Sequence, residues 1–124
     1  MGVTIPIRWR DVDALGHVNN AVYLTYLEEL LVVVLGPILG DDYVTARVEL
    51  DFRNEIRLGE RKVTASAAVE RIGNSSLTVA VQIARPDGAV ALEGRTVLVA
   101  WDRERRQSRP LTETEREALA ALPM

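Results

Sequence analysis

The chain has 124 residues, of which 48% are hydrophobic and 27% are charged, and its formal net charge is −3. This length favours a single domain over residues 1–124, and the small negative charge gives no reason to expect nucleic acid or an anionic membrane as a partner. The absence of cysteine excludes disulfides, thiolate metal sites and cysteine nucleophiles.

The N-terminal residues 1–9 do not resemble a secretion signal, because they lack its apolar segment. No apolar run is expected to reach the roughly 20 residues that span a bilayer. These observations predict a soluble, cytoplasmic protein with no membrane partner.

The chain is predicted to begin with a strand over residues 3–10, where apolar side chains occupy every second position. Residues 11–20 break this alternation with Gly16 and two adjacent asparagines, so they are predicted to form a loop. Asn19 or Asn20 can then cap the helix that follows, because an asparagine side chain accepts hydrogen bonds from the first free N–H groups.

The best helix candidate spans residues 21–35 and carries one narrow polar stripe, made by Thr25, Glu28 and Glu29. The rest of its circumference is apolar, so the helix must be covered on several sides. Gly36–Pro37 is expected to end it, since proline does not continue a helix.

Four further strands are predicted from an apolar period of two. Turn residues separate them, at Gly59, at Gly73–Asn74 and in the Pro-Asp-Gly sequence at 86–88. The last strand is apolar on both faces, so it is expected inside the sheet, and Gly94 could form a bulge in it. The predicted strands cover residues 44–53, 63–69, 77–83 and 89–101, and in the first of them Val44, Ala46, Val48, Leu50 and Phe52 are expected to share one face.

The C-terminal part begins with a charged segment, residues 102–109, which is expected to be a solvated connector. Thr112 and Glu115 then have the spacing of a capping box before a short helix that ends at Leu122. Short turns imply antiparallel neighbours, which predicts an α+β fold with a five-stranded sheet. One sheet covers only one side of an apolar helix, so a second subunit is expected to cover the rest.

Elimination narrows the chemistry that the side chains allow. His17 is the sole histidine, and none of the serines lies in a G-x-S-x-G sequence. Phosphate-binding glycine patterns are absent. A zinc site would have one histidine plus carboxylates, which is a poor ligand set, so no metal or cofactor is expected. A hydrolase built from this chain must use aspartate or glutamate as base or nucleophile.

Asp13 is the best candidate for that group. It lies three residues before Gly16 and shortly before the predicted helix, so its carboxylate could face the helix N-terminus. Unpaired N–H groups near Asn20 and Ala21 would stabilise the oxyanion of an attacked carbonyl. The carboxylate could attack that carbonyl, or deprotonate a water that does. The alternative is an aspartate that caps its own loop.

Other residues of this stretch also have two interpretations. His17 could orient substrate or donate a proton, or it could be a loop histidine held by a backbone carbonyl. Asn19 and Asn20 are more often caps than catalysts. Tyr23 and Tyr26 lie one turn apart on the predicted helix and are most simply core or interface residues.

The stretch from Arg8 to Glu29, RWRDVDALGHVNNAVYLTYLEE, resembles hotdog-fold thioesterases of the 4-hydroxybenzoyl-CoA thioesterase type. The resemblance implies a hotdog fold, in which a five-stranded antiparallel sheet wraps around a long central helix over nearly the whole chain. It also implies a homodimer or a dimer of dimers.

The resemblance implies a role for each matching position. Asp13 matches the catalytic carboxylate, and Gly16 matches the glycine that lets the loop meet the thioester. His17 and Asn20 match positions around the acyl carbonyl or at the subunit interface. Together with Tyr23 of the same motif, Gly16, His17 and Asn20 are expected to bind substrate.

At three places the sequence departs from patterns found in related hotdog proteins. Leu15 stands where plant-type acyl-carrier-protein thioesterases carry an asparagine, which leaves Asp13 with His17. Leu30 and Leu31 stand where relatives often carry a basic residue. His17 follows Asp13 by four residues without a proline, whereas hotdog hydratases use Asp-x-Asn-Pro-x-His, so a hydratase is disfavoured.

Two functions remain open. The first is an enzyme that hydrolyses an acyl-CoA or acyl-carrier-protein thioester to free acid and thiol, with Arg57 and Arg61 as candidate contacts for CoA phosphates. The second is a non-catalytic hotdog module that holds such a thioester, with the loop residues as anchors and caps. The intact Asp13 favours the enzyme.

Overall fold

The computed structural model of the chain describes residues 2–123. Two 3-10 turns, η1 (Trp9–Asp11) and η2 (Leu58–Glu60), lie in the connections between larger elements. The larger elements are β1 (Gly2–Pro6), α1 (Asn20–Leu39), β2 (Tyr43–Phe52), β3 (Lys62–Ile72), β4 (Ser76–Ala84), β5 (Val90–Asp102), β6 (Gln107–Ser108) and α2 (Glu113–Ala120).

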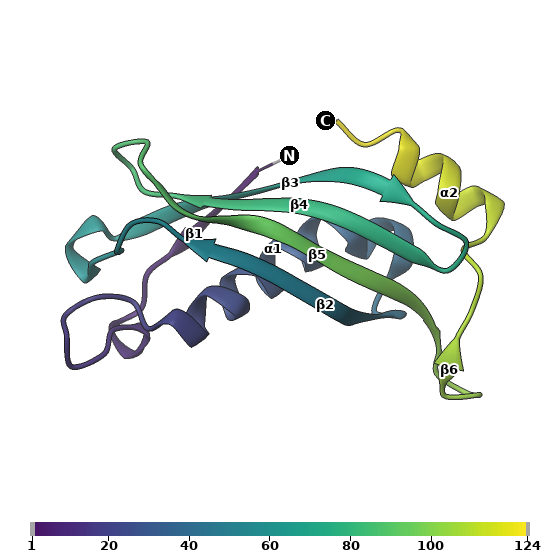
Figure 1. Cartoon of the computed structure of the whole chain (residues 1–124), viewed down its shortest axis with the longest axis horizontal. Coiled ribbons are helices and arrows are strands. Elements are labelled where there is room, and N and C mark those ends of the chain that lie inside the picture. Colours follow the sequence, from purple (N-terminus) through teal and green to yellow (C-terminus); the bar gives the residue numbers. More distant parts are fainter. Residues whose placement is uncertain (1, 124) are drawn as a thin grey trace.

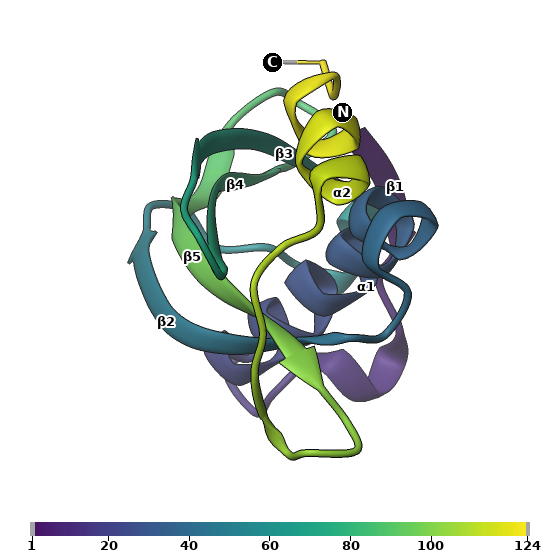
Figure 2. The same cartoon turned by 90° about the vertical axis from the view of Figure 1, so that its right-hand side faces the viewer.

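One antiparallel sheet forms the body of the molecule. Its strands follow the order β1-β3-β4-β5-β2, and the short β6 pairs with β5 beside this path. Figure 1 shows α1 running along the sheet, and the end-on view in Figure 2 shows the sheet curled around the helix. The predicted α+β fold, with five antiparallel strands around a long central helix, is confirmed.

The core lies between α1 and the concave face of the sheet. β3 and β4 bury every second side chain against the helix, as their apolar period of two requires. α1 itself packs against β1, β3 and α2. On the helix the buried residues are Tyr23, Tyr26, Leu27, Leu30, Leu31, Val34, Leu35 and Leu39.

The predicted end of α1 at Gly36–Pro37 is wrong, because the helix continues to Leu39. Proline lacks the N–H that would bond to the carbonyl of Val33, four residues earlier. Val33 and Pro37 are both exposed, so water can satisfy that carbonyl. Gly40 follows as the C-cap, and its positive φ of 60° suits glycine.

The length of α1 also corrects the expectation that no apolar segment is long enough to span a bilayer. The helix has 20 residues and a mean hydropathy of 1.8, which by length and composition would suffice. Its buried side packs on the sheet, and a core helix of this kind passes the same test.

A bulge in β2 changes the predicted alternation of that strand. The pairing with β5 shifts register between Thr45 and Arg47, so Ala46 is an extra residue. Val48 lies opposite the buried Thr96, on the concave face. Val44 lies on the other face, so the expectation that it shares a face with Val48 is wrong.

Gly94 does not form the bulge considered for β5. It pairs in register with Leu50 on one side and Val81 on the other. A side chain at this position would overlap the carbonyl oxygen of Glu49, so β2 and β5 approach more closely here than a Cβ allows. Gly94 therefore permits a close approach of two neighbouring strands.

The other helices and strands begin or end a few residues away from their predicted boundaries. The first strand ends at Pro6 rather than at residue 10, and η1 follows it. Glycine turns occur as predicted at Gly73 and at Gly88, which has a φ of 89°. Part of the charged segment 102–109 pairs as β6 instead of serving only as a connector. α2 has the predicted capping box but ends at Ala120.

Candidate active site

A closed loop connects η1 to α1. Val12 and Val18 form an isolated antiparallel bridge at its base. Within the loop, the Asp13 N–H donates to the His17 carbonyl at 3.0 Å, and the Gly16 N–H donates to the Asp13 carbonyl at 3.1 Å. Gly16 has a φ of 84°, a conformation that glycine adopts without the strain of a side chain. The loop therefore holds Asp13 and His17 on a fixed turn.

A second loop, between β2 and β3, lies beside the first one at the same end of the molecule (Figure 1). The Val18 N–H donates to the carbonyl of the fully buried Ile56 at 2.7 Å. His17 forms an isolated bridge with Arg57. These backbone contacts bring residues distant in sequence next to His17.

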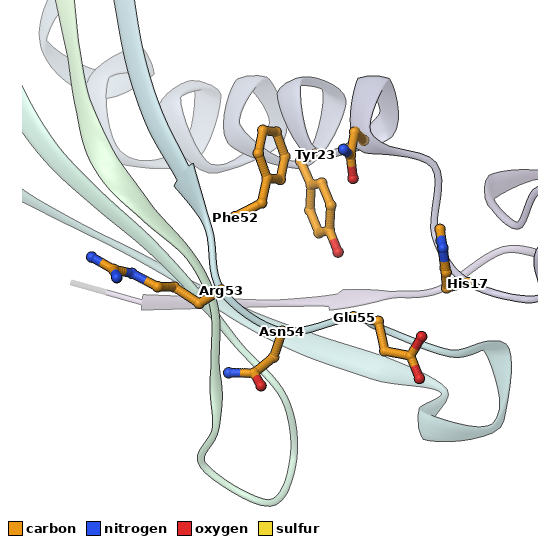
Figure 3. A pocket seen from close by; sticks show the side chains of 7 residues that line it. His17, Tyr23, Phe52, Arg53, Asn54 and Glu55 are labelled. Atoms are coloured by element: carbon orange, nitrogen blue, oxygen red, sulfur yellow. The ribbon is translucent and has the colours of Figure 1, made fainter.

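A cavity of about 250 Å³ lies between this pair of loops and the N-terminal turn of α1. Figure 3 shows Tyr23 projecting from the helix into the space between Phe52 and His17, with Glu55 on the opposite wall. The Tyr23 and Phe52 rings are in contact, with centroids 5.4 Å apart. The cavity is lined by His17, Asn20, Tyr23, Phe52, Arg53, Asn54 and Glu55.

Asp13 does not itself line this cavity, but it lies next to His17, which does. Its Oδ1 accepts a hydrogen bond from the Leu15 N–H at 2.9 Å, which is the loop-capping arrangement considered from the sequence. The same oxygen lies 3.7 Å from Nδ1 of His17. Within residues 2–123, Oδ2 of Asp13 has no hydrogen-bond partner, so one carboxylate oxygen remains available to accept a proton.

His17 lines the cavity and also neighbours Asp13. Its Nδ1 lies 3.3 Å from the Val18 carbonyl, so a proton on Nδ1 would be held by the backbone. No partner for Nε2 is found in the described part of the chain. The ring can therefore present Nε2 to a ligand while Asp13 lies beside its other nitrogen.

The start of α1 supplies fewer free amides than the sequence suggested. Asn19 is the N-cap, and its side chain accepts the Ala21 N–H at 2.9 Å. Its carbonyl accepts the Val22 N–H at 2.9 Å. The expected oxyanion donor at Ala21 is thus already occupied. The Asn20 N–H has no partner among the described residues and lies at the positive end of the helix.

Tyr23 contributes a neutral hydroxyl to the cavity wall. Burial raises the pKa of Tyr23, and the negative charges of Glu60 and Glu55 raise it further. The phenol therefore keeps its proton near neutral pH and can donate a hydrogen bond. Tyr23 was expected either as a core or interface residue or, from the resemblance, as a substrate contact, and its side chain is buried and also lines the cavity.

The second wall of the cavity was not predicted from the sequence. Arg53, Asn54 and Glu55 follow β2, where the alternation of the strand simply stops. Glu55 forms an ion pair with Arg57, whose Nε lies 2.6 Å from Oε1. Only the backbone contact between the two loops, which no local pattern encodes, places these residues opposite His17.

The two arginines considered for phosphate contact differ in their surroundings. The guanidinium of Arg57 is engaged by Glu55, whereas Arg61 has no ion pair within residues 2–123. Arg61 adopts a φ of 68°, and its carbonyl accepts the Ile7 N–H at 2.7 Å. No group of three or more His, Cys, Asp or Glu residues suited to a metal ion occurs in the same part of the chain.

The chain is similar to known proteins in sequence and in fold. Residues 7–120 match the sequence model of the thioesterase-like superfamily. A thioesterase from Thermus thermophilus, solved with coenzyme A and Zn, is 34% identical, with a TM-score of 0.88 and 97% of each chain covered. A predicted thioesterase from Bacillus stearothermophilus is 28% identical, with a TM-score of 0.89, covering 96% of this chain and 92% of that one.

A third structure shows the same fold at lower identity. A 1,4-dihydroxy-2-naphthoyl-CoA thioesterase from Synechocystis is 15% identical, with a TM-score of 0.83, covering 98% of this chain and 96% of that one. No curated protein matches the sequence significantly. The family relationship therefore rests on the sequence model and on the solved structures.

Proposed function

This chain belongs to the thioesterase-like superfamily, and from that premise we propose that it hydrolyses an acyl thioester, with an acyl-CoA as substrate. The observation that carries the proposal is the placement of Asp13 and His17 beside a cavity that also meets the Asn20 end of α1. The similar Thermus protein was solved with coenzyme A, which supports CoA as the thiol.

The proposed reaction uses one carboxylate, one imidazole and one amide. Asp13 acts as general base, or alternatively as nucleophile, and in the first case it accepts a proton from the attacking water while His17 positions the reactants. The water oxygen bonds to the thioester carbon, and the Asn20 N–H stabilises the resulting oxyanion. Collapse of this intermediate breaks the carbon–sulfur bond, and the thiolate leaves and takes up the proton.

Substrate binding is proposed to involve Gly16, His17, Asn20 and Tyr23. Gly16 leaves the loop surface open, since nothing lies within 4 Å of where its Cβ would be. Asn20 and the Tyr23 hydroxyl supply polar contacts at the cavity wall. Acyl length, and the choice between CoA and a carrier protein, depend on how the substrate extends beyond these residues.

We further propose that the protein acts in the cytoplasm as a homodimer or a dimer of dimers. β2 is an edge strand of ten residues, and its concave face leaves Val48 40% and Phe52 50% exposed. Leu24 on α1 is 44% exposed. A second copy on this side would cover unpaired strand edge and apolar surface together, and its edge would border the cavity at Phe52.

The alternative is a non-catalytic module that binds an acyl thioester without cleaving it. The hydrogen bond from the Leu15 N–H to Asp13 favours this interpretation, because it gives the carboxylate a purely structural task. The two functions make different predictions for the same protein and ligand.

A substrate panel separates them. The wild-type protein is incubated with short, long and aromatic acyl-CoAs, and free thiol is measured alongside the thermal shift that each compound produces. The enzyme interpretation predicts thiol release from at least one of them. Stabilisation by acyl-CoA without thiol release from any chain length would favour the binding module. A 3-hydroxyacyl product from an enoyl thioester would instead indicate a hydratase.

A further inference from the structure

Asp11 and Tyr26 form a buried polar contact that the proposed reaction does not use. Asp11 is 6% exposed and Tyr26 is fully buried. The Tyr26 hydroxyl donates a hydrogen bond to Oδ2 of Asp11 at 2.6 Å, and the Arg8 N–H donates to the same oxygen at 2.9 Å. A carboxylate shielded from water requires such donors, and bonds to a charged acceptor are the stronger kind.

The protonation state of Tyr26 suits this contact. Burial raises the pKa of Tyr26, and the hydrogen bond to Asp11 raises it further. The phenol therefore stays protonated across the physiological range and remains a donor. Its ring also packs edge-on against Tyr23, with centroids 6.4 Å apart.

Asp11 fixes both ends of the loop that carries Asp13. Its side chain is tied to the second turn of α1 through Tyr26. Its backbone carbonyl accepts the N–H of Asn19, the N-cap of the same helix, at 3.0 Å. The next residue, Val12, forms the bridge that closes the loop. One residue thus sets the position of the loop relative to the start of α1.

We propose that Asp11 and Tyr26 are positioning residues for thioester cleavage, an inference that rests on the proposed function. They hold Asp13 and His17 at a fixed distance from the Asn20 N–H without touching the substrate. A displacement of about 1 Å in a catalytic group can lower the rate about 100-fold, so a small shift of the loop is sufficient to matter.

The test is the Tyr26→Phe variant, which removes the hydroxyl and keeps the ring that packs on Tyr23. We expect kcat for acyl-CoA hydrolysis to fall about 10- to 100-fold, with KM changed by less than about 3-fold, because the cavity wall stays in place. Tyr43→Phe is the matched control. Tyr43 is half-buried at the start of β2, whereas the cavity lies at the other end of that strand, beside Phe52. The kcat of Tyr43→Phe should therefore equal that of wild type.

Two additional measurements separate positioning from general stability. All rates are measured per folded protein, well below the melting temperature of each variant. Asp11→Asn, which keeps an oxygen acceptor for Tyr26, should retain a higher kcat than Asp11→Ala. The Val18 amide, which is bonded to Ile56, should exchange with deuterium faster in Tyr26→Phe and at the wild-type rate in Tyr43→Phe.

The outcomes are distinguishable from failure of the proposed function. An active wild type with an unchanged kcat in Tyr26→Phe overturns the positioning role, even if the melting temperature falls. An unchanged exchange rate at Val18 overturns it as well. A wild type that cleaves no thioester refutes the function and the positioning role together.

Discussion

Single residues decide how closely the parts of this protein approach one another. Gly94 allows β2 to lie close to its neighbour β5, and Gly16 allows the turn that carries Asp13. The second role was predictable, because glycine within a polar segment indicates a turn. The role of Gly94 was not, because glycine in a strand can mark either a bulge or a close approach of two backbones, and the sequence does not distinguish them.

Gly94→Ala is expected to destabilise the protein. The new methyl group would overlap the Glu49 carbonyl oxygen, which is backbone and cannot rotate away. We expect the free energy of unfolding, measured by urea denaturation, to fall by about 1–3 kcal/mol or more. Gly36→Ala is the matched control. Nothing lies within 4 Å of that added group in α1, and alanine should raise the free energy of unfolding by up to about 1 kcal/mol. A Gly94→Ala variant as stable as wild type would contradict this close contact between β2 and β5.

Some individual residues of the candidate site were predictable from the sequence. Asp13, Gly16 and His17 fall on one turn, as their spacing suggested. The sequence could not show that the Ala21 N–H is occupied by Asn19, because either adjacent asparagine was able to cap the helix.

Secondary-structure elements in this protein are joined by a few specific polar contacts. α2 is held by the capping box of Thr112 and Glu115 and by Arg109, whose two terminal nitrogens each lie 2.8 Å from a Glu115 oxygen. The capping box was predicted from spacing alone. The end of α1 was not predicted correctly. An exposed proline in the last turn leaves only one backbone carbonyl without its helical partner, and water can bond to that carbonyl.

The Arg109–Glu115 contact makes stability depend on pH. Hydrogen bonding to Arg109 holds the pKa of Glu115 below its ordinary value of 4.5. A lowered pKa in the folded state means that the contribution is complete above pH 4.5 and is lost as pH falls through the lowered value.

Glu115→Gln should therefore lower the free energy of unfolding by about 1–3 kcal/mol at neutral pH, and the difference from wild type should shrink below pH 4.5. Urea denaturation at several pH values measures this. Glu113→Gln is the control, since Glu113 is an exposed acid in the same helical turn and its effect should be smaller. A difference that does not depend on pH would refute the role of the charge.

In the whole molecule, the concave side of the edge strand β2 is one apolar surface that the chain leaves incompletely covered. The sheet was predictable from its turns and alternation, and its curl around α1 follows from the apolar circumference of the helix. The bulge at Ala46 was not predictable, so the sequence assigned Val44 to the wrong face. Val48 and Phe52 remain exposed on the concave side of the edge strand.

Val48→Lys tests whether a second copy covers that side. A lysine there places a charge on the concave face of an edge strand, which opposes pairing with another chain. We expect wild type to sediment as a dimer or larger, and the variant to sediment as a monomer with reduced turnover. Thr4→Lys, on the opposite edge strand β1, should leave the assembly intact. A wild-type monomer at micromolar concentration would exclude the proposed assembly.

The most direct measurement compares thiol release from an acyl-CoA by wild type, Asp13→Asn and Asp102→Asn. Asparagine keeps the oxygen that accepts the Leu15 N–H, so the loop is retained while the base is lost. Asp102 caps a turn in the same way, accepting the Glu104 N–H at 3.0 Å, and it lies in the β5–β6 hairpin. We predict that Asp13→Asn lowers kcat by about 10²–10⁴ and that Asp102→Asn leaves it unchanged. Wild-type turnover in Asp13→Asn would show that this carboxylate only caps its loop.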